Sequence, residues 1–129
     1  MRTLVHFEAM GGEWAVPIER VHEVRLPIGI APLPAPKPGI AGVLRRGDEV
    51  LTVLSVLGDA AGHVLVLEGA GERFGLVVES AIGILRVEES AITATPAGQE
   101  NPVVSGVIRA DEQRMILILD TDELAKGLQ

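Results

Sequence analysis

The chain contains an internal repeat, and this feature limits its possible folds more than any other. Residues 4–26, shifted by sixty positions, align with residues 64–86 without a gap, and residues 38–57 align with 102–121 at a shift of sixty-four. Identical pairs in register include Glu8 and Glu68, Gly11 and Gly71, Glu19 and Glu79, Pro38 and Pro102, Gly42 and Gly106, and Arg45 and Arg109. Alternating apolar residues match easily by chance, but agreement of Gly, Pro and Glu in register favours a true repeat. Each half therefore predicts the same unit of a hairpin, a third strand, a long loop and a second hairpin.

The segments within each unit have the pattern of β-strands. Val, Ile and Leu occur in short runs that Gly and Pro interrupt, which is typical of strands. Trp14, Val16 and Ile18 alternate with smaller or breaking residues, as in a strand with one buried face. Residues 50–54 and 115–119 are apolar on both faces. Five strands per half is the number in a small SH3-like barrel.

We therefore predict a mainly β protein in which two five-stranded SH3-like barrels form one domain, 1–129, with approximate halves 1–60 and 61–129. Residues 57–62 are expected to join the two barrels. Residues 121–129 have a helical pattern, with Thr121 as a candidate cap. Residues 27–38 hold five of the 8 prolines and predict an extended surface loop, because proline fits neither a helix interior nor a central strand.

Composition excludes several classes of function. The chain has 129 residues, a net charge of −7 and no Cys, which argues against a phosphate-binding surface, disulfides and thiol chemistry. The first residues lack the apolar run of a signal peptide, and no apolar stretch is long enough to cross a membrane. We expect a cytoplasmic protein that does not insert into membranes and binds no nucleic acid.

Residue patterns for catalysis or metal binding are also missing from the sequence. His6, His22 and His63 have no metal-ligand spacing. Residues 69–75 are rich in Gly but have the wrong spacing for a nucleotide loop, and a strand follows them rather than a helix. No Ser lies in a G-x-S-x-G elbow. We therefore expect a protein that is not an enzyme and that has no cofactor and no metal site.

Local phrases along nearly the whole chain resemble the CheW family of chemotaxis coupling proteins. In chain order they are V-H-F-E at 5–8, E-W-A-V-P-I at 13–18, V-H-E-V-R at 21–25, P-G-I-A-G-V-L at 38–44, G-L-V-V-E at 75–79, G-V-I at 106–108 and I-L-I-L-D at 116–120. The third phrase matches the family's V-x-E strand, and the fourth leads into its N-L-R-G hairpin. The order and spacing of these phrases make the resemblance specific.

The resemblance implies an interface formed by the V-x-E strand and the hairpin. The residues at these positions are Val21, Glu23, Arg25, Arg45, Arg46 and Gly47. The sequence departs from the family pattern N-L-R-G-x-v-x-P-v-x-D-L, since Arg45 and Arg46 stand where Asn and Leu are usual, Thr52 replaces the Pro and Ser55 the Asp. We expect a hairpin with an altered tip, in which Glu23 pairs with Arg46 or with Arg45. Val21 and Glu23 are expected on one exposed strand face.

The resemblance also implies a function without bond chemistry. Proteins of this family contact the cytoplasmic tip of a chemoreceptor and the regulatory domain of a CheA-type histidine kinase, and so hold the two together. The alternatives are a detached kinase regulatory domain of the same fold and a small-molecule-binding β-barrel. A ligand barrel needs a hollow interior, whereas the inward positions here are bulky aliphatic residues that fill small barrels.

Overall fold

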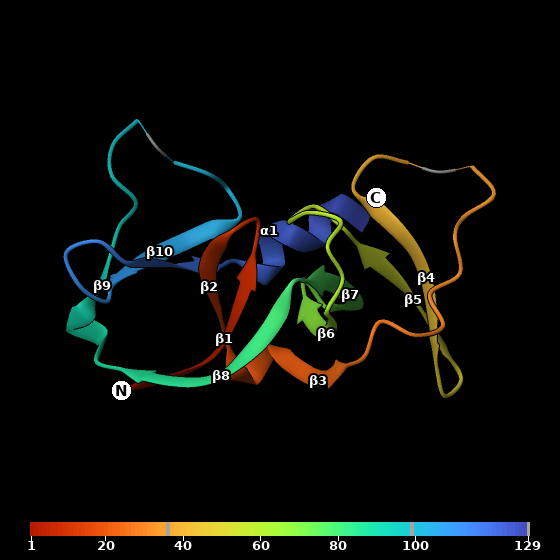
Figure 1. The fold of residues 1–129 in the computed structure, drawn as a ribbon, viewed down its shortest axis with the longest axis horizontal. Helices are drawn as coiled ribbons and strands as arrows, with labels where there is room; N and C mark the ends of the chain where they lie inside the picture. The colour runs from red at the N-terminus through yellow and green to blue at the C-terminus, as the bar shows by residue number, and fades with distance from the viewer. Residues whose placement is uncertain (36, 99, 129) are drawn as a thin grey trace.

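A computed structural model describes residues 1–35, 37–98 and 100–128 and contains two sheets, seen as the left and right groups of strands in Figure 1. Sheet A has six strands in the order β8-β1-β2-β11-β10-β9, and sheet B has five in the order β3-β6-β7-β5-β4. The strands are β1 (Arg2–Ala9), β2 (Gly12–Pro17), β3 (Val21–Arg25), β4 (Ile40–Arg46), β5 (Glu49–Leu54), β6 (His63–Gly69), β7 (Glu72–Val78), β8 (Ser80–Val87), β9 (Ile92–Thr93), β10 (Val104–Arg109) and β11 (Met115–Leu119). The mainly β fold class is confirmed, although the sheets are curled and do not close into complete barrels.

Each sheet is assembled from strands of both sequence halves. Strands β1 and β2 join β8–β11 in sheet A, while β6 and β7 join β3–β5 in sheet B. The chain crosses between sheets through the 3-10 turn Ile18–Arg20 and again at Glu79. The sequence halves 1–60 and 61–129 therefore do not coincide with the two sheets. Our expectation that residues 57–62 join two barrels is wrong, because this segment connects β5 to β6 within sheet B.

In each sheet, one parallel strand pair brings strands of the two sequence halves together. β2 runs parallel to β11, and β7 runs parallel to β5, whereas the other ladders are antiparallel. Each parallel pair joins the first hairpin of one half to the last strand of the other half. Two repeats offer similar strand edges, so the hydrophobic pattern does not tell whether a hairpin pairs with its own half or with the other.

The two sheets are related strand by strand. Replacing each strand of sheet A by its repeat counterpart reproduces the order of sheet B. The isolated bridge between Ala31 and Val43 occupies the place of the pair between Thr93 and Val107. Gly42 pairs with Val53 in sheet B, and Gly106 pairs with Ile118 in sheet A. The shift between the two repeats is therefore 106 − 42 = 64 residues before the tip of this hairpin and 118 − 53 = 65 residues after it. The tip between β10 and β11 is thus one residue longer than the tip between β4 and β5, whereas a uniform shift was expected.

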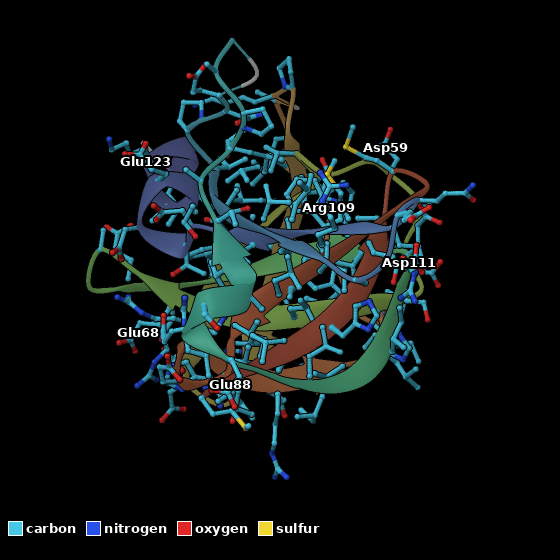
Figure 2. All side chains as sticks on the ribbon, turned by 90° about the vertical axis from the view of Figure 1, so that its left-hand side faces the viewer. Asp59, Glu68, Glu88, Arg109, Asp111 and Glu123 are labelled. Atoms are coloured by element: carbon cyan, nitrogen blue, oxygen red, sulfur yellow. The ribbon has the colours of Figure 1, made fainter. Side chains whose placement is uncertain are left out.

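Apolar side chains form three clusters. One is drawn from all six strands of sheet A and includes Leu4, Ile108 and Ile118. Another lies within sheet B and includes Leu44 and Val53. The largest joins the two sheets, and its buried members are Val5, Phe7, Ala9, Trp14, Val16, Leu54, Leu57, Leu65, Leu67, Phe74, Leu76, Val78, Leu119, Leu124 and Ala125. Charged side chains such as Glu68, Glu88 and Glu123 lie at the periphery (Figure 2).

The C-terminal helix lies between the two groups of strands in Figure 1. It comprises α1 (Thr121–Ala125) and a 3-10 turn, Lys126–Leu128, while Gln129 lies outside the described residues. The expected cap is wrong, because Asp120 is the N-cap and its Oδ1 accepts a hydrogen bond from Glu123 N at 3.1 Å. Thr121 is instead buried.

The described parts of two long loops, residues 26–35 with 37–39 and residues 94–98 with 100–103, extend to the same side of the molecule in Figure 1. In the proline-rich segment, residues 27–35 and 37–38 are irregular apart from the bridge at Ala31, as expected for a surface loop. Pro36 lies outside the described residues.

Candidate interaction surface on sheet B

The edge strand β3 carries the V-x-E residues, and a bulge interrupts it. Val21 pairs with Leu67 and Glu23 with Val66, so His22 is an extra residue in this ladder. Alternation of faces does not hold across a bulge. Val21 is half-buried and packs against the cluster between the sheets, whereas Val24 is 43% exposed. The expectation that Val21 is exposed beside Glu23 is therefore wrong.

The hairpin of β4 and β5 places Arg46 within reach of Glu23. A two-residue loop, Gly47 and Asp48, separates the paired residues Arg46 and Glu49. Gly47 has a φ of 61°, which glycine adopts without steric cost. Arg46 Nε donates to Glu23 Oε1 at 3.2 Å, and its Nη1 donates to Glu49 Oε1 at 3.0 Å. Of the two expected pairings for Glu23, the structure contains the one with Arg46.

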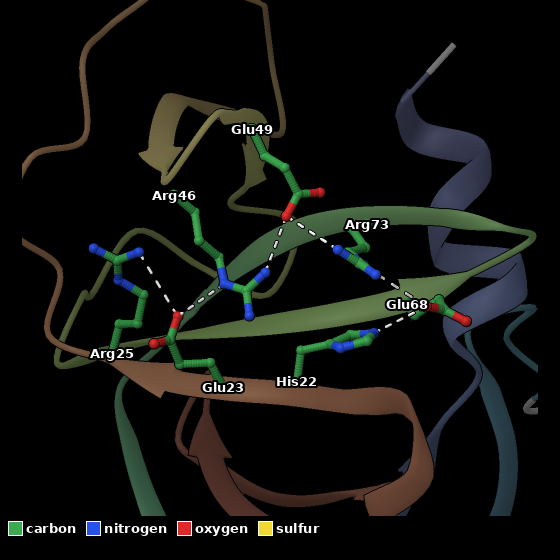
Figure 3. Close-up of polar contacts among 7 residues, drawn as sticks. All are labelled: His22, Glu23, Arg25, Arg46, Glu49, Glu68 and Arg73. Atoms are coloured by element: carbon green, nitrogen blue, oxygen red, sulfur yellow. Dashed lines mark hydrogen bonds and ion pairs between the residues drawn. The ribbon is translucent and has the colours of Figure 1, made fainter.

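This pair is part of a larger ionic network on sheet B (Figure 3). Arg73 Nη1 donates to Glu49 Oε1 at 3.1 Å, and Arg73 Nε lies 3.9 Å from Glu68 Oε1. His22 Nε2 lies 2.9 Å from the same oxygen of Glu68. His22 is covalently adjacent to Glu23, so the contacts close a ring. We call the six residues His22, Glu23, Arg46, Glu49, Arg73 and Glu68 the sheet B ring.

Together with the neighbouring Arg25, the charged side chains of the ring carry no net charge. Its two Arg and three Glu, together with Arg25, whose Nη1 lies 3.7 Å from Glu23 Oε1, give +3 − 3 = 0 with His22 neutral. Their side chains are 29–42% exposed. Each exposed pair contributes only about 0–1 kcal/mol to stability. The main consequence of the ring is that polar side chains from all five strands of sheet B form one connected network.

Sequence reasoning missed four members of the ring, His22, Glu49, Glu68 and Arg73. A signal for two of them was present, since Glu68 and Arg73 are directly opposite across the turn of β6 and β7 and cross-strand opposite charges attract. The role of His22 depends on the bulge, for which the sequence offers no signal.

The remaining expected residues are placed around the ring. Arg45 is exposed and pairs with Val50, which is 67% exposed, and adjacent strand residues point to opposite faces. Arg45 therefore points away from Arg46. Large apolar side chains are also exposed along and beyond the edge strands β3 and β8, namely Val24, Leu26, Ile28, Ile82 and Ile84. Both strands run along the lower margin of Figure 1.

The histidines have structural partners. His6 Nε2 lies 3.0 Å from Glu13 Oε1, and His63 Nδ1 accepts a hydrogen bond from Ala81 N at 3.1 Å. Within 1–35, 37–98 and 100–128, no group of three or more His, Asp or Glu side chains is arranged to hold a metal ion. The helices of this part of the chain are too short to cross a membrane.

A second ionic cluster lies on sheet A. Arg114 donates to both carboxylate oxygens of Glu13, at 2.8 and 2.7 Å. These hydrogen bonds, together with the charge of Arg114 and the contact with His6, lower the pKa of Glu13 from 4.5 to about 2. This cluster holds the tip between β10 and β11 against β2.

Comparisons with known proteins agree on one family and one fold. The family model for the CheW-like domain matches residues 3–129. The crystal structure of the scaffolding protein TtCheW from Thermoanaerobacter tengcongensis superposes with a TM-score of 0.86 at 21% sequence identity, covering 95% of this chain and 86% of that chain. No curated protein matches.

Proposed function

Because the chain belongs to the CheW-like domain family, we propose that it is a non-catalytic scaffold of bacterial two-component signalling. In this proposal it acts as a single cytoplasmic domain that binds the tip of a chemoreceptor and the regulatory domain of a CheA-type histidine kinase. Holding both partners raises their effective concentration and fixes their relative geometry. The output can be chemotaxis or a related pathway.

The observation that carries this proposal is the sheet B ring, which extends from the edge strand β3 across all five strands of the sheet. Glu23 and Arg46 have two partners each, at 3.0–3.7 Å. Side chains that are ordered before binding lose less entropy when a partner docks. Exposed Val24 and Leu26 on the same edge supply apolar area beside the charges. An ordered polar group beside apolar side chains suits a partner helix with a mixed surface.

We assign roles to the interface residues on the basis of their positions. Glu23, Arg25 and Arg46 contact the receptor, and Gly47 shapes the hairpin tip. Val21 supports β3 from the core side. Arg45, which points away from Arg46, is available to the second partner. A receptor signal alters the kinase only if its two states differ in contact energy with this scaffold.

A bridging experiment tests the function. A receptor cytoplasmic hairpin that includes the tip is immobilised, and the isolated kinase regulatory domain is added with and without this protein. We expect retention of the kinase domain to depend on the protein. A receptor hairpin truncated before the tip is the control and should retain neither. Retention that is equal without the protein, or failure of the protein to bind either partner, would contradict the proposal.

A further inference from the structure

Sheet A carries a cavity of about 320 Å³ outside the cluster that fills its interior. Its apolar wall includes Trp14 from β2, Val107 from β10, and Met115 and Leu117 from β11. Thr95 and Asn101, which precede β10, also line the cavity and carry polar side chains. Met115 is 46% exposed, so the cavity opens to solvent beside this residue.

The cavity lies beside Trp14, whose repeat counterpart Phe74 has different surroundings. Trp14 and Phe74 are repeat counterparts and belong to the same cluster between the sheets. On sheet B this cluster is extended by Leu124 and Leu128 of the C-terminal segment, and Phe74 is fully buried. Trp14 instead borders the open cavity. The C-terminal segment has no counterpart in the first half, because there the chain continues from β5 into β6.

We propose that this cavity binds a small planar aromatic molecule that carries one hydroxyl or ring N–H group. An apolar cavity of about 150 Å³ is large enough to bind benzene, so this cavity has room for one or two rings. The indole of Trp14 offers an aromatic wall, and the thioether of Met115 makes favourable contacts with aromatic rings. Thr95 and Asn101 face the polar substituent. This proposal does not rest on the scaffold function.

The single Trp of the chain reports on the site directly. Trp14 Nε1 donates to Ala9 O at 3.2 Å, so its indole N–H gives one defined signal in a nitrogen-15 NMR spectrum of the labelled protein. Unlabelled p-cresol and indole are titrated, with cyclohexanol as the non-aromatic control. We expect a saturable shift of the Trp14 signal by the two aromatic probes, and an affinity for cyclohexanol at least about tenfold weaker.

Two variants locate the binding site. Val107→Phe fills the cavity and should weaken p-cresol at least about tenfold, while the matched change Val43→Phe, at the counterpart position on sheet B, should leave binding intact. Thr95→Val replaces the hydroxyl group by a methyl group of similar size. It should weaken p-cresol but not toluene, and it keeps the proposal testable if Val107→Phe does not fold.

Four outcomes would overturn the proposal. They are no saturable shift with either aromatic probe, equal binding of cyclohexanol, unchanged p-cresol affinity in folded Val107→Phe together with Thr95→Val, and a short peptide with a central tyrosine binding as tightly as p-cresol. The last result would make the occupant a side chain of a partner protein rather than a free molecule.

Discussion

The two sheets have the same order of repeat-related strands, but among the described residues the ionic ring is present on sheet B only, where it spans all five strands. Counterparts of His22, Glu23 and Arg46 on sheet A are Ile82, Gly83 and Ala110, by the shifts of 60 and 64 that relate the repeats. None of these three can form an ion pair. Sheet A therefore has an apolar edge strand, β8, whereas the corresponding edge strand of sheet B, β3, forms an ion pair through Glu23.

One ion pair is present in both sheets with its charges exchanged. Glu49 and Arg73 of sheet B correspond to Arg114 and Glu13 of sheet A, with contacts of 3.1 Å and 2.7 Å respectively. In both sheets the pair ties the second hairpin to the neighbouring strand of the first hairpin. An ion pair is therefore present at this position in both sheets, and either of the two positions can carry the negative charge.

The comparison between the sheets distinguishes contacts that serve the fold from residues that the fold does not need. A contact present in both sheets serves the fold, whereas Glu23, Arg46 and His22 are present in one sheet only. Because sheet A reaches the same strand order without them, these residues are not needed to build a sheet of this type. This argument supports the assignment of Glu23 and Arg46 to an interface.

The largest expected effect is on partner binding by Glu23→Arg. The new arginine lies beside Arg25 and Arg46, which are within 3.7 Å of Glu23 in the native protein. Charge reversal in a desolvated interface costs about 2–5 kcal/mol of binding free energy. Stability should change by only about 0.5 kcal/mol, as for most surface substitutions. Calorimetric titration with a receptor tip fragment and thermal unfolding measure the two quantities.

The matched control introduces the same residue at the counterpart position. A Cβ atom at Gly83 would meet open space, with no heavy atom within 4 Å, so Gly83→Arg should fold and bind receptor normally. The double change Glu23→Arg with Arg46→Glu should recover the part of the loss that comes from the internal pair. Equal loss of binding in Gly83→Arg and Glu23→Arg would mean that net charge, not the ring, determines affinity.

The next effect concerns two counterpart glycines. Gly42 has a φ of 153°, and a Cβ atom there would collide with the carbonyl oxygen of Ala31. At Gly106 the nearest atom to a Cβ would be Ile92 Cγ2 at 3.1 Å. We expect Gly42→Ala to lower the free energy of unfolding by about 3 kcal/mol and Gly106→Ala by about 1 kcal/mol. Urea denaturation measures both losses. Equal losses would show that the backbone at Ala31 can move away from a new Cβ atom as easily as β9 can.

Much of the fold was predictable because it depends on local patterns. Alternation around Trp14 and the glycines and prolines between runs located the strands, and the repeat predicted two related units. The exchange of hairpins between the units was not predictable, because the edges of β5 and β11 offer similar partners to β2 and β7. Pairing between distant strands is decided by packing, which the periodicity of a single strand does not contain.

The candidate site was predictable only in part. The family phrase located Glu23, and the hairpin supplied Arg46 and Arg45 as its two possible partners, of which the structure contains Arg46. The error at Val21 came from assuming regular alternation through a strand that contains a bulge at His22. Glu49 was missed because its role depends on Arg73, a residue of another hairpin that the parallel pairing of β5 and β7 brings alongside.

A smaller expected effect is the pH dependence of stability, which should differ between the two charge-exchanged ion pairs. The pKa of Glu13 is about 2 in the folded protein, below its ordinary value of 4.5, because Arg114 hydrogen-bonds the carboxylate. A lowered folded-state pKa stabilises the protein above about pH 4.5, and this contribution is lost as the pH falls toward 2. The side chain is 24% exposed, so screening by water limits the contribution to about 1–2 kcal/mol.

We therefore expect Glu13→Gln to be less stable than the native protein at pH 7, with the difference shrinking between pH 4.5 and 2. Glu49→Gln breaks the exchanged pair, which is more exposed at 39% and 42%, and should lose only about 0–1 kcal/mol. Urea denaturation at a series of pH values measures both. A constant difference between Glu13→Gln and the native protein from pH 7 to 2 would contradict the assignment.

The smallest effect compares the first hairpin turns of the two repeats. Met10 and Ala70 occupy the same turn position with φ values of 55° and 49°, a conformation that asparagine tolerates better than other side chains with a Cβ atom. Ala70 is exposed and its backbone N–H, which Asp122 Oδ1 accepts at 2.7 Å, is retained in any variant. Ala70→Asn should therefore raise the free energy of unfolding by about 0.5–1 kcal/mol. Met10→Asn should gain less, because the Met10 side chain lies over Gly58 and loses that contact. Urea denaturation of the two variants decides the point: a larger gain for Met10→Asn would mean that the methionine contributes nothing over Gly58 and that the two turns differ only in backbone strain.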